Sequence, residues 1–203
     1  MPAGRYTLLD QAVGPVGTES FRSAPGPGGW RYFGEFDSIE PVRHGTVDVV
    51  AGASWGIVRV RIDTGEHSLL LEARDGALVG ERDGSSVVIA FAPELDVDYL
   101  TTATNVTAAR RLGGSGELTV AFIDPITLVP EPLQQRYTLL SSADDVRTPV
   151  GLFRAERWRY EDESGFSAHL WLAGDTVVAY EGLFELERYE PGATGARPIS
   201  DGS

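Results

Sequence analysis

Two aspartates separated by one residue are the first candidates for chemistry in this chain. Asp96 and Asp98 lie in the segment ELDVDYL, where strand alternation would place both carboxyl groups on one face. Paired carboxylates can act as general acid and base, or bind a hard cation. The alternative is a solvated strand face, which we favour because acidic clusters recur along the chain.

Two arginine pairs are the matching basic features. Arg59 and Arg61 alternate along one apolar run, and Arg110 and Arg111 are adjacent. The guanidinium group offers a planar fork of donors that pairs with carboxylates or holds a ligand headgroup. For each arginine taken singly, a surface role is the simpler interpretation.

Other common catalytic and metal-binding patterns are missing from the sequence. His44, His67 and His169 are far apart and show no metal-ligand spacing. Ser115 lies among glycines, but a nucleophile elbow would need glycine where Glu117 stands. The chain has no cysteine and, since all 17 basic residues are arginines, no phosphate-binding loop with its lysine. We therefore expect a protein that is not an enzyme, with no metal and no cofactor.

The charge balance limits the partners. The chain has 203 residues, 30 of them acidic against 17 basic, and a net charge of -13. Such a surface repels phosphate backbones and anionic lipid headgroups, so we expect neither nucleic-acid binding nor stable membrane insertion. The first residues lack a signal-peptide pattern, which favours a cytoplasmic location.

The elements that must position these side chains are strands and turns. In WGIVRVRID, Val58, Val60 and Ile62 alternate with the two arginines, which predicts a strand with one buried face. In the segment that follows, Asp75-Gly76 and Asp83-Gly84 separate three apolar runs, a pattern typical of tight hairpin turns. Later, Gly174-Asp175 marks another hairpin.

One short helix interrupts this pattern. The segment TNVTAARRLG predicts a helix that Thr104 or Asn105 caps and that stops at Gly113. Pro- and Gly-rich breaks at 24–29 and 124–132 indicate a long hairpin loop and a crossover between two parts of the sheet.

A repeated pentapeptide suggests duplication. RYTLL occurs at 5–9 and at 136–140, and each copy is followed in order by a VG, an FR and a WRY segment. Repetition in order indicates two similar units packed together, although strand-forming residues also recur in any β protein. We predict one domain over 1–190, with halves at roughly 5–123 and 136–189, and a disordered tail at 191–203.

The segment from Pro93 to Leu140 resembles the bacterial family described as glycolipid-binding proteins. The matching features are the D-x-D pair, a T-x-x-T-N turn, a basic pair before Leu-Gly, and Gln-Arg-Tyr-Thr. The Trp-containing segment 53–62 and the closing YEGLFELERY at 180–189 are also similar to that family. The likeness therefore covers most of the chain, from about residue 30 to 189.

The resemblance implies a fold akin to the lipoprotein-carrier proteins. That fold is all-β, with one antiparallel sheet curled into an incomplete barrel or spiral roll and little helix. It also implies binding of a lipid, glycolipid or similar amphiphile on the concave side, without catalysis. A filled core, with the protein acting as an interaction or scaffold module, is the alternative.

The candidate ligand-binding residues come from the matched segments. Asp98, Asn105, Arg110 and Arg111 would form a polar cluster that orients a headgroup, or would pin the roll through a buried salt bridge. Tryptophans suit the wall or mouth of a cavity because they combine an apolar body with one N–H donor. The full set of candidates is Trp55, Asp98, Asn105, Arg110, Arg111 and Tyr137.

Overall fold

The computed structural model describes residues 1–37, 44–92 and 94–199. The described chain contains fifteen strands and one helix. The elements are β1 (Ala3–Asp10), β2 (Gly14–Gly26), β3 (Gly29–Asp37), β4 (His44–Gly52), β5 (Ile57–Asp63), β6 (Ser68–Arg74), β7 (Ala77–Arg82), β8 (Ser85–Ile89), β9 (Val97–Asp98), α1 (Thr102–Leu112), β10 (Gly116–Ile123), β11 (Pro130–Thr148), β12 (Gly151–Asp162), β13 (Ser167–Ala173), β14 (Thr176–Tyr180) and β15 (Phe184–Glu190).

All fifteen strands belong to one sheet. Their order is β8-β7-β6-β5-β4-β3-β2-β1-β15-β14-β13-β12-β11-β10-β9. Neighbours are antiparallel throughout, except for the short parallel pair β9 and β10. β8 and β9 form the two edges, so the sheet does not close into a barrel.

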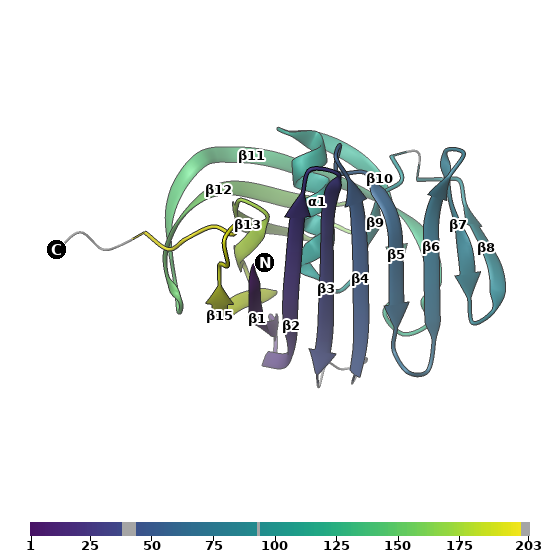
Figure 1. The fold of residues 1–203 in the computed structure, drawn as a ribbon, viewed down its shortest axis with the longest axis horizontal. Helices are drawn as coiled ribbons and strands as arrows, with labels where there is room; N and C mark the ends of the chain where they lie inside the picture. Colours follow the sequence, from purple (N-terminus) through teal and green to yellow (C-terminus); the bar gives the residue numbers. More distant parts are fainter. Residues whose placement is uncertain (38–43, 93, 200–203) are drawn as a thin grey trace.

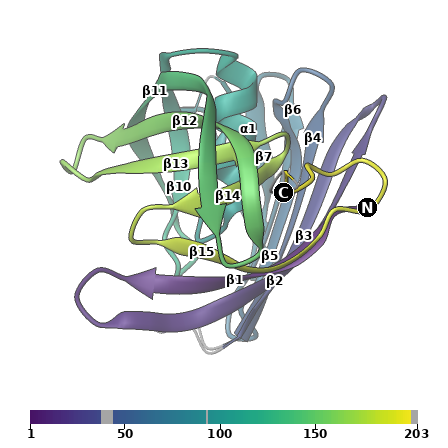
Figure 2. The same cartoon turned by 90° about the vertical axis from the view of Figure 1, so that its left-hand side faces the viewer.

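The sheet curls around α1. Figure 1 shows β2 to β8 as one wall, with β11, β12 and β13 passing behind it and α1 between the two. Figure 2 shows this arrangement from the left-hand side of Figure 1, with the β1–β2 ribbon at its lower edge. The predicted all-β fold, with one antiparallel sheet in an incomplete barrel, is confirmed.

Inward-facing apolar residues build the core between the walls. On β3, Trp30, Tyr32 and Phe36 are buried and alternate with less buried residues. On β4, Val47 and Val49 have no exposed surface. This alternation is the period of two that a sheet with one covered face requires.

Val58 departs from its predicted place. The register between β4 and β5 shifts after Val50, and Ile57 rather than Val58 pairs with Ala51. Ile57 is therefore buried, whereas Val58 is 47% exposed on the outer face. A β-bulge adds one residue to one strand, which reverses the faces beyond it. The inward positions of Val60 and Ile62 are as predicted.

The Asp-Gly hairpin turns are confirmed. Asp75 and Gly76 have φ values of 49° and 78°, and Asp83 and Gly84 have 51° and 75°. Positive φ at both central residues is the geometry of the tight turn that the sequence predicts. Gly174 likewise turns β13 into β14.

Two predicted connections are wrong. Pairing of β2 with β3 continues to Gly26 and Gly29, so a two-residue turn replaces the expected long loop at 24–29. The segment 124–129 joins β10 to its antiparallel neighbour β11 and is a hairpin connection, not a crossover. Proline does not end pairing here, because Pro130 and Pro132 lie within β11. The chain instead crosses from one sheet edge to the other after Ile89.

The helix begins earlier than predicted. Thr101 is the N-cap, in an extended conformation, and its side-chain oxygen accepts a hydrogen bond from the N–H of Ala103. The helix ends at Gly113 as predicted, in the left-handed conformation with φ 62°. Within the described residues, no helix is long and apolar enough to cross a membrane.

The repeat does not mark equivalent positions in the sheet. The first copy lies on β1, and its VG/FR and WRY segments lie on β2 and β3. The second copy lies on β11, but its FR and WRY segments share one long strand, β12. The crossover divides the sheet into β1–β8 and β9–β15, whereas the predicted halves at 5–123 and 136–189 group β9, α1 and β10 with the first part.

The last of the described residues contacts the sheet. The N–H of Ile199 donates to the carbonyl of Leu152 at 2.6 Å, so the segment predicted as a disordered tail returns to β12 at this point. Residues 200–203 lie outside the described residues.

Candidate functional site

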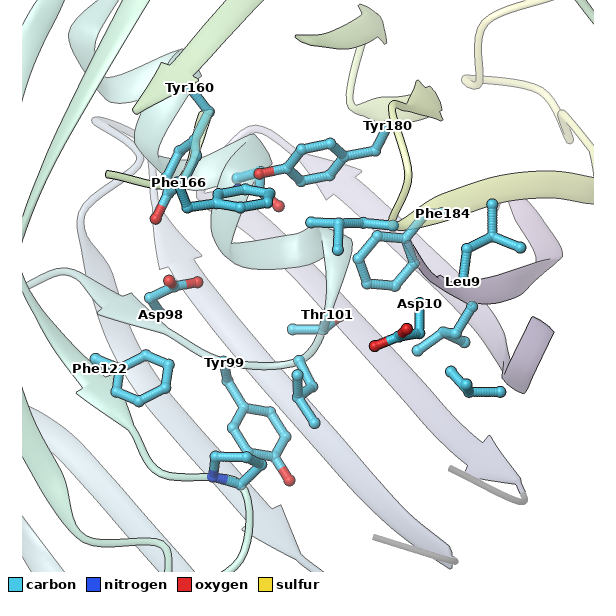
Figure 3. Close-up of a pocket in the computed structure, with 16 residues that line it drawn as sticks. Leu9, Asp10, Asp98, Tyr99, Thr101, Phe122, Tyr160, Phe166, Tyr180 and Phe184 are labelled. Carbon is cyan, nitrogen blue, oxygen red and sulfur yellow. The ribbon is translucent and has the colours of Figure 1, made fainter. Parts of the chain in front are cut away.

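An apolar pocket opens on the concave side of the curled sheet. Its volume is about 340 Å³. Figure 3 shows the side chains that converge on it from β1, β9, the start of α1, β12, β14 and β15. The lining residues are Leu8, Leu9, Asp10, Val16, Asp98, Tyr99, Leu100, Thr101, Asn105, Phe122, Pro125, Tyr160, Phe166, Tyr180, Leu183 and Phe184.

Four aromatic rings form a connected series along one wall. The ring centroids of Phe166 and Tyr160 are 5.9 Å apart, and those of Tyr160 and Tyr180 are 6.5 Å apart. Tyr180 stacks on Phe184 at 6.0 Å. These rings come from β12, β14, β15 and the turn before β13, and β12 to β15 are consecutive strands of the sheet.

Asp98 is one of two acidic residues in the pocket lining. Its Oδ1 accepts a hydrogen bond from Thr104 Oγ1 at 3.1 Å, and its Oδ2 accepts one from Gln135 Nε2 at 2.7 Å. Gln135 also donates to the hydroxyl of Tyr160 at 3.0 Å. Removal from water raises the pKa of Asp98 to about 6, against the opposing effect of these hydrogen bonds.

Asn105 and Tyr137 form the second polar contact. The Asn105 amide donates to the Tyr137 hydroxyl at 3.0 Å. Asn105 lines the pocket, whereas Tyr137 is buried behind it and packs edge-on against Tyr160 at 5.3 Å. The sequence-predicted residues Asp98, Asn105 and Tyr137 therefore lie in one cluster.

Asp96 points away from the pocket into the protein. It has no exposed surface, so the interpretation of Asp96 and Asp98 as a solvated strand face is wrong. Thr107 Oγ1 lies 3.5 Å from its Oδ1 and Arg111 lies 4.0 Å from its Oδ2. Burial raises the pKa of Asp96 to about 7. Only two residues of ELDVDYL form a strand, so simple alternation does not hold there.

The two arginines lie outside the pocket lining. Arg110 forms an ion pair with Glu156 at 2.6 Å and donates to the carbonyl of Gly174. Arg111 donates to the carbonyl of Glu94 and faces Asp96. Both therefore tie the end of α1 to neighbouring segments, which is the structural alternative that the sequence left open.

Trp55 also lies outside the lining. It occupies a turn with φ 65°, and its ring lies 5.7 Å from that of Trp30. Trp30 donates its indole N–H to Asp175 at 2.7 Å. These tryptophans belong to the core and its margin.

Sequence reasoning missed a third buried carboxyl group. Glu19 on β2 has no exposed surface, and its Oε1 accepts hydrogen bonds from Thr101 at 2.7 Å and Tyr32 at 2.9 Å. Its Oε2 has no partner within the described chain. Burial raises the pKa of Glu19 to about 7. The alternation along β2 could have indicated this burial, because Glu19 lies on the same inward face as Phe21.

The aromatic wall was missed for a different reason. Phe166, Tyr180 and Phe184 are ordinary strand and turn residues in the sequence, and only sheet order brings them together.

Over the described parts of the chain, no group of three or more acidic or histidine side chains could hold a metal ion.

Comparisons with known proteins give a likeness of fold. No family model matches the chain, and no curated protein matches it. The crystal structure of a DUF1089 family protein from Pseudomonas aeruginosa superposes with a TM-score of 0.59 at 20% identity, covering 82% of this chain and 91% of that one. A beta-barrel-like protein of domain of unknown function DUF1849 from Brucella abortus has a TM-score of 0.48 at 10% identity, covering 93% and 96%.

The likeness to the first of these structures supports the curled β fold and shows nothing beyond the fold. Neither description names a ligand or an activity. The predicted glycolipid binding and the likeness to lipoprotein carriers therefore stay predictions.

Proposed function

We propose that this protein binds a lipid-like amphiphile in the pocket and does not transform it. The observation that carries this proposal is the lining of the pocket, which is mostly aliphatic and aromatic with a few polar groups around Asp98 and Asn105. Small-molecule sites are typically apolar cavities of about 300–1,000 Å³ with a few placed polar groups. The volume of about 340 Å³ is at the lower end of that range and suits one slender ligand.

An apolar chain would supply most of the binding free energy. Each CH₂ group moved from water into such a lining contributes about 0.8 kcal/mol. The polar end would meet Asp98 and Asn105. Because the described lining contains Asp10 and Asp98 but no arginine or histidine, negatively charged headgroups are disfavoured. Uncharged sugar headgroups, as in glycolipids, satisfy this condition.

A pocket-filling substitution tests the proposal. We expect purified protein to bind the neutral fluorescent probe N-phenylnaphthylamine, and Leu183→Trp to reduce its affinity at least about tenfold by occupying the cavity. Leu140→Trp is the matched control, since Leu140 is 41% exposed on β11 and does not line the pocket. Native mass spectrometry before and after organic extraction would show any ligand that co-purifies.

Two results would overturn the proposal. One is the absence of both a co-purifying ligand and probe binding. The other is equal probe affinity in wild-type protein and Leu183→Trp. Either result would favour the alternative of an interaction module that acts through its acidic outer surface.

A further inference from the structure

The pocket holds a carboxylate that no cation neutralises. The hydrogen-bond partners of Asp98 are the Thr104 hydroxyl and the Gln135 amide, which are both uncharged. Within the described chain, neither Asp98 nor Asp10 has an arginine or histidine partner. Asp162 and Asp96 also interact with Asp98 electrostatically, and both add negative charge. The pocket therefore combines low polarity with negative potential.

The wall beside this carboxylate consists of π faces and edges. Phe166, Tyr160, Tyr180 and Phe184 follow one another at centroid separations of 5.9, 6.5 and 6.0 Å. Burial raises the pKa of both tyrosine phenols, so they stay uncharged at neutral pH. Aromatic groups with an adjacent acid attract organic cations, and quaternary ammonium ligands bind in such aromatic cages.

We propose that the polar end of the ligand is a cationic amine or ammonium group that lies between the Asp98 carboxylate and the aromatic wall. This inference rests on the proposed function, because it names the chemical class of the amphiphile that the pocket binds. An apolar chain would extend toward Leu8, Leu9 and Leu183. The net charge of -13 would also draw a cationic ligand toward the protein.

The geometry disfavours the other headgroups for distinct reasons. A carboxylate or phosphate would face two acids and no base. A sugar or alcohol could donate a hydrogen bond to Asp98 but would gain no charge attraction from the carboxylate and no cation–π attraction from the rings. The three classes therefore differ in predicted affinity for a common apolar chain.

Four ligands with the same decyl chain test the proposal by competition with N-phenylnaphthylamine at pH 8. They are decyltrimethylammonium, decanol, decyl glucoside and decanoate. We expect the ammonium compound to bind at least about tenfold more tightly than decanoate and several-fold more tightly than the two uncharged compounds. The Asp98→Asn variant should lose most of the advantage of the ammonium compound while binding decanol normally.

The variant is designed to preserve the local hydrogen bonds. An asparagine oxygen at position 98 can accept from Gln135, and its amide can donate to Thr104. Asp145→Asn is the matched control, because it removes the same charge from an exposed ion pair with Arg154 on the outer surface. It should leave the order of affinities unchanged.

The outcomes separate this proposal from the one on which it rests. If none of the four compounds binds, the proposed function fails. If decanoate binds as tightly as the ammonium compound, or decyl glucoside binds most tightly and Asp98→Asn has no effect, the pocket binds amphiphiles but the cationic headgroup is wrong. The ranking in wild-type protein decides this even if a variant does not fold.

Discussion

Three threonines spaced one helical turn apart each meet a buried carboxyl group. Thr101 donates to Glu19, Thr104 contacts Asp98, and Thr107 lies near Asp96. A hydroxyl has one proton, and those of Thr104 and Thr107 also reach backbone carbonyls at 3.2 and 2.9 Å. Where that proton goes to the carbonyl, a protonated carboxyl can donate to the hydroxyl oxygen. Each of these hydroxyls can therefore serve the charged and the protonated form of the carboxyl group beside it.

Raised pKa values make the stability of the protein depend on pH. Burial raises the pKa of Glu19 from 4.5 to about 7, so the folded state retains a proton that the unfolded chain has lost. The stability from this group is fully present below about pH 4 and is lost as the pH rises to about 7. Asp96 and Asp98 act in the same direction over similar ranges.

Glu19→Gln should remove part of this pH dependence. Between pH 5 and pH 8 we expect the free energy of unfolding to fall less in Glu19→Gln than in wild-type protein, by on the order of 2 kcal/mol. Urea denaturation at a series of pH values measures the slope. Glu117→Gln, at a position whose side chain is 64% exposed, is the control and should keep the wild-type slope. Equal slopes for Glu19→Gln and wild-type protein would contradict the assignment.

At the scale of the element, α1 is a helix buried within the curl of the sheet. Residues 102–109 are all buried, and the helix has no acidic residue in its first turn. Its start is stabilised by the Thr101 cap and by the carboxyl group of Glu19 from β2. Its end depends on the left-handed conformation of Gly113, whose N–H donates to the carbonyl of Ala109.

Two neighbouring glycines allow the free-energy cost of a positive φ angle to be measured without a steric clash. A Cβ added to Gly113 or to Gly114 would meet no atom within 4 Å. Only Gly113 has positive φ, so Gly113→Ala should destabilise the protein by about 1 kcal/mol. Gly114→Ala should be neutral or slightly stabilising, because alanine restricts the unfolded chain. Chemical denaturation of the two variants side by side would test this, and equal losses would contradict it.

Local signals predict these elements well where neighbouring residues determine the outcome. The Asp-Gly turns and the stop at Gly113 follow from backbone preferences that act within a few residues. The burial of Asp96 and the exposure of Val58 do not, because each depends on which strand lies alongside and in which register. A bulge or a two-residue strand leaves no trace in the alternation pattern.

The candidate site likewise contains residues that the sequence predicts and residues that it does not. Asp98, Asn105 and Tyr137 were predicted from matched segments, and the structure places them together. The aromatic wall was not predicted, because side chains of β12, β14 and β15 reach the same pocket as those of β9 and α1 only through the curl of the sheet. Arg110 and Arg111 were predicted with the cluster, but helical geometry turns them toward Glu156 and Glu94.

At the scale of the whole molecule, the two parts of the sheet join at its centre. β1 pairs with β2 on one side and with β15 on the other, so one strand links β1–β8 to β9–β15. Tyr6 on β1 is 1% exposed and donates from its hydroxyl to the carbonyl of Val177 on β14 at 2.8 Å. Its ring also stacks on Phe21 and contacts Phe184 edge-on. The core is therefore continuous across the junction.

A continuous core predicts that the molecule unfolds as one unit. Urea unfolding followed by far-ultraviolet circular dichroism and by tryptophan fluorescence should give coincident transitions, because Trp30 and Trp158 lie on opposite sides of the junction in the same core. Tyr6→Phe should lower the free energy of unfolding by about 1 kcal/mol, since it leaves the Val177 carbonyl without this donor, and the transition should stay single. Hydrogen exchange should then show similar opening free energies for the central amides of β4 and β12. A separate transition, or markedly lower protection in either wall, would show instead that β1 joins two units that unfold independently.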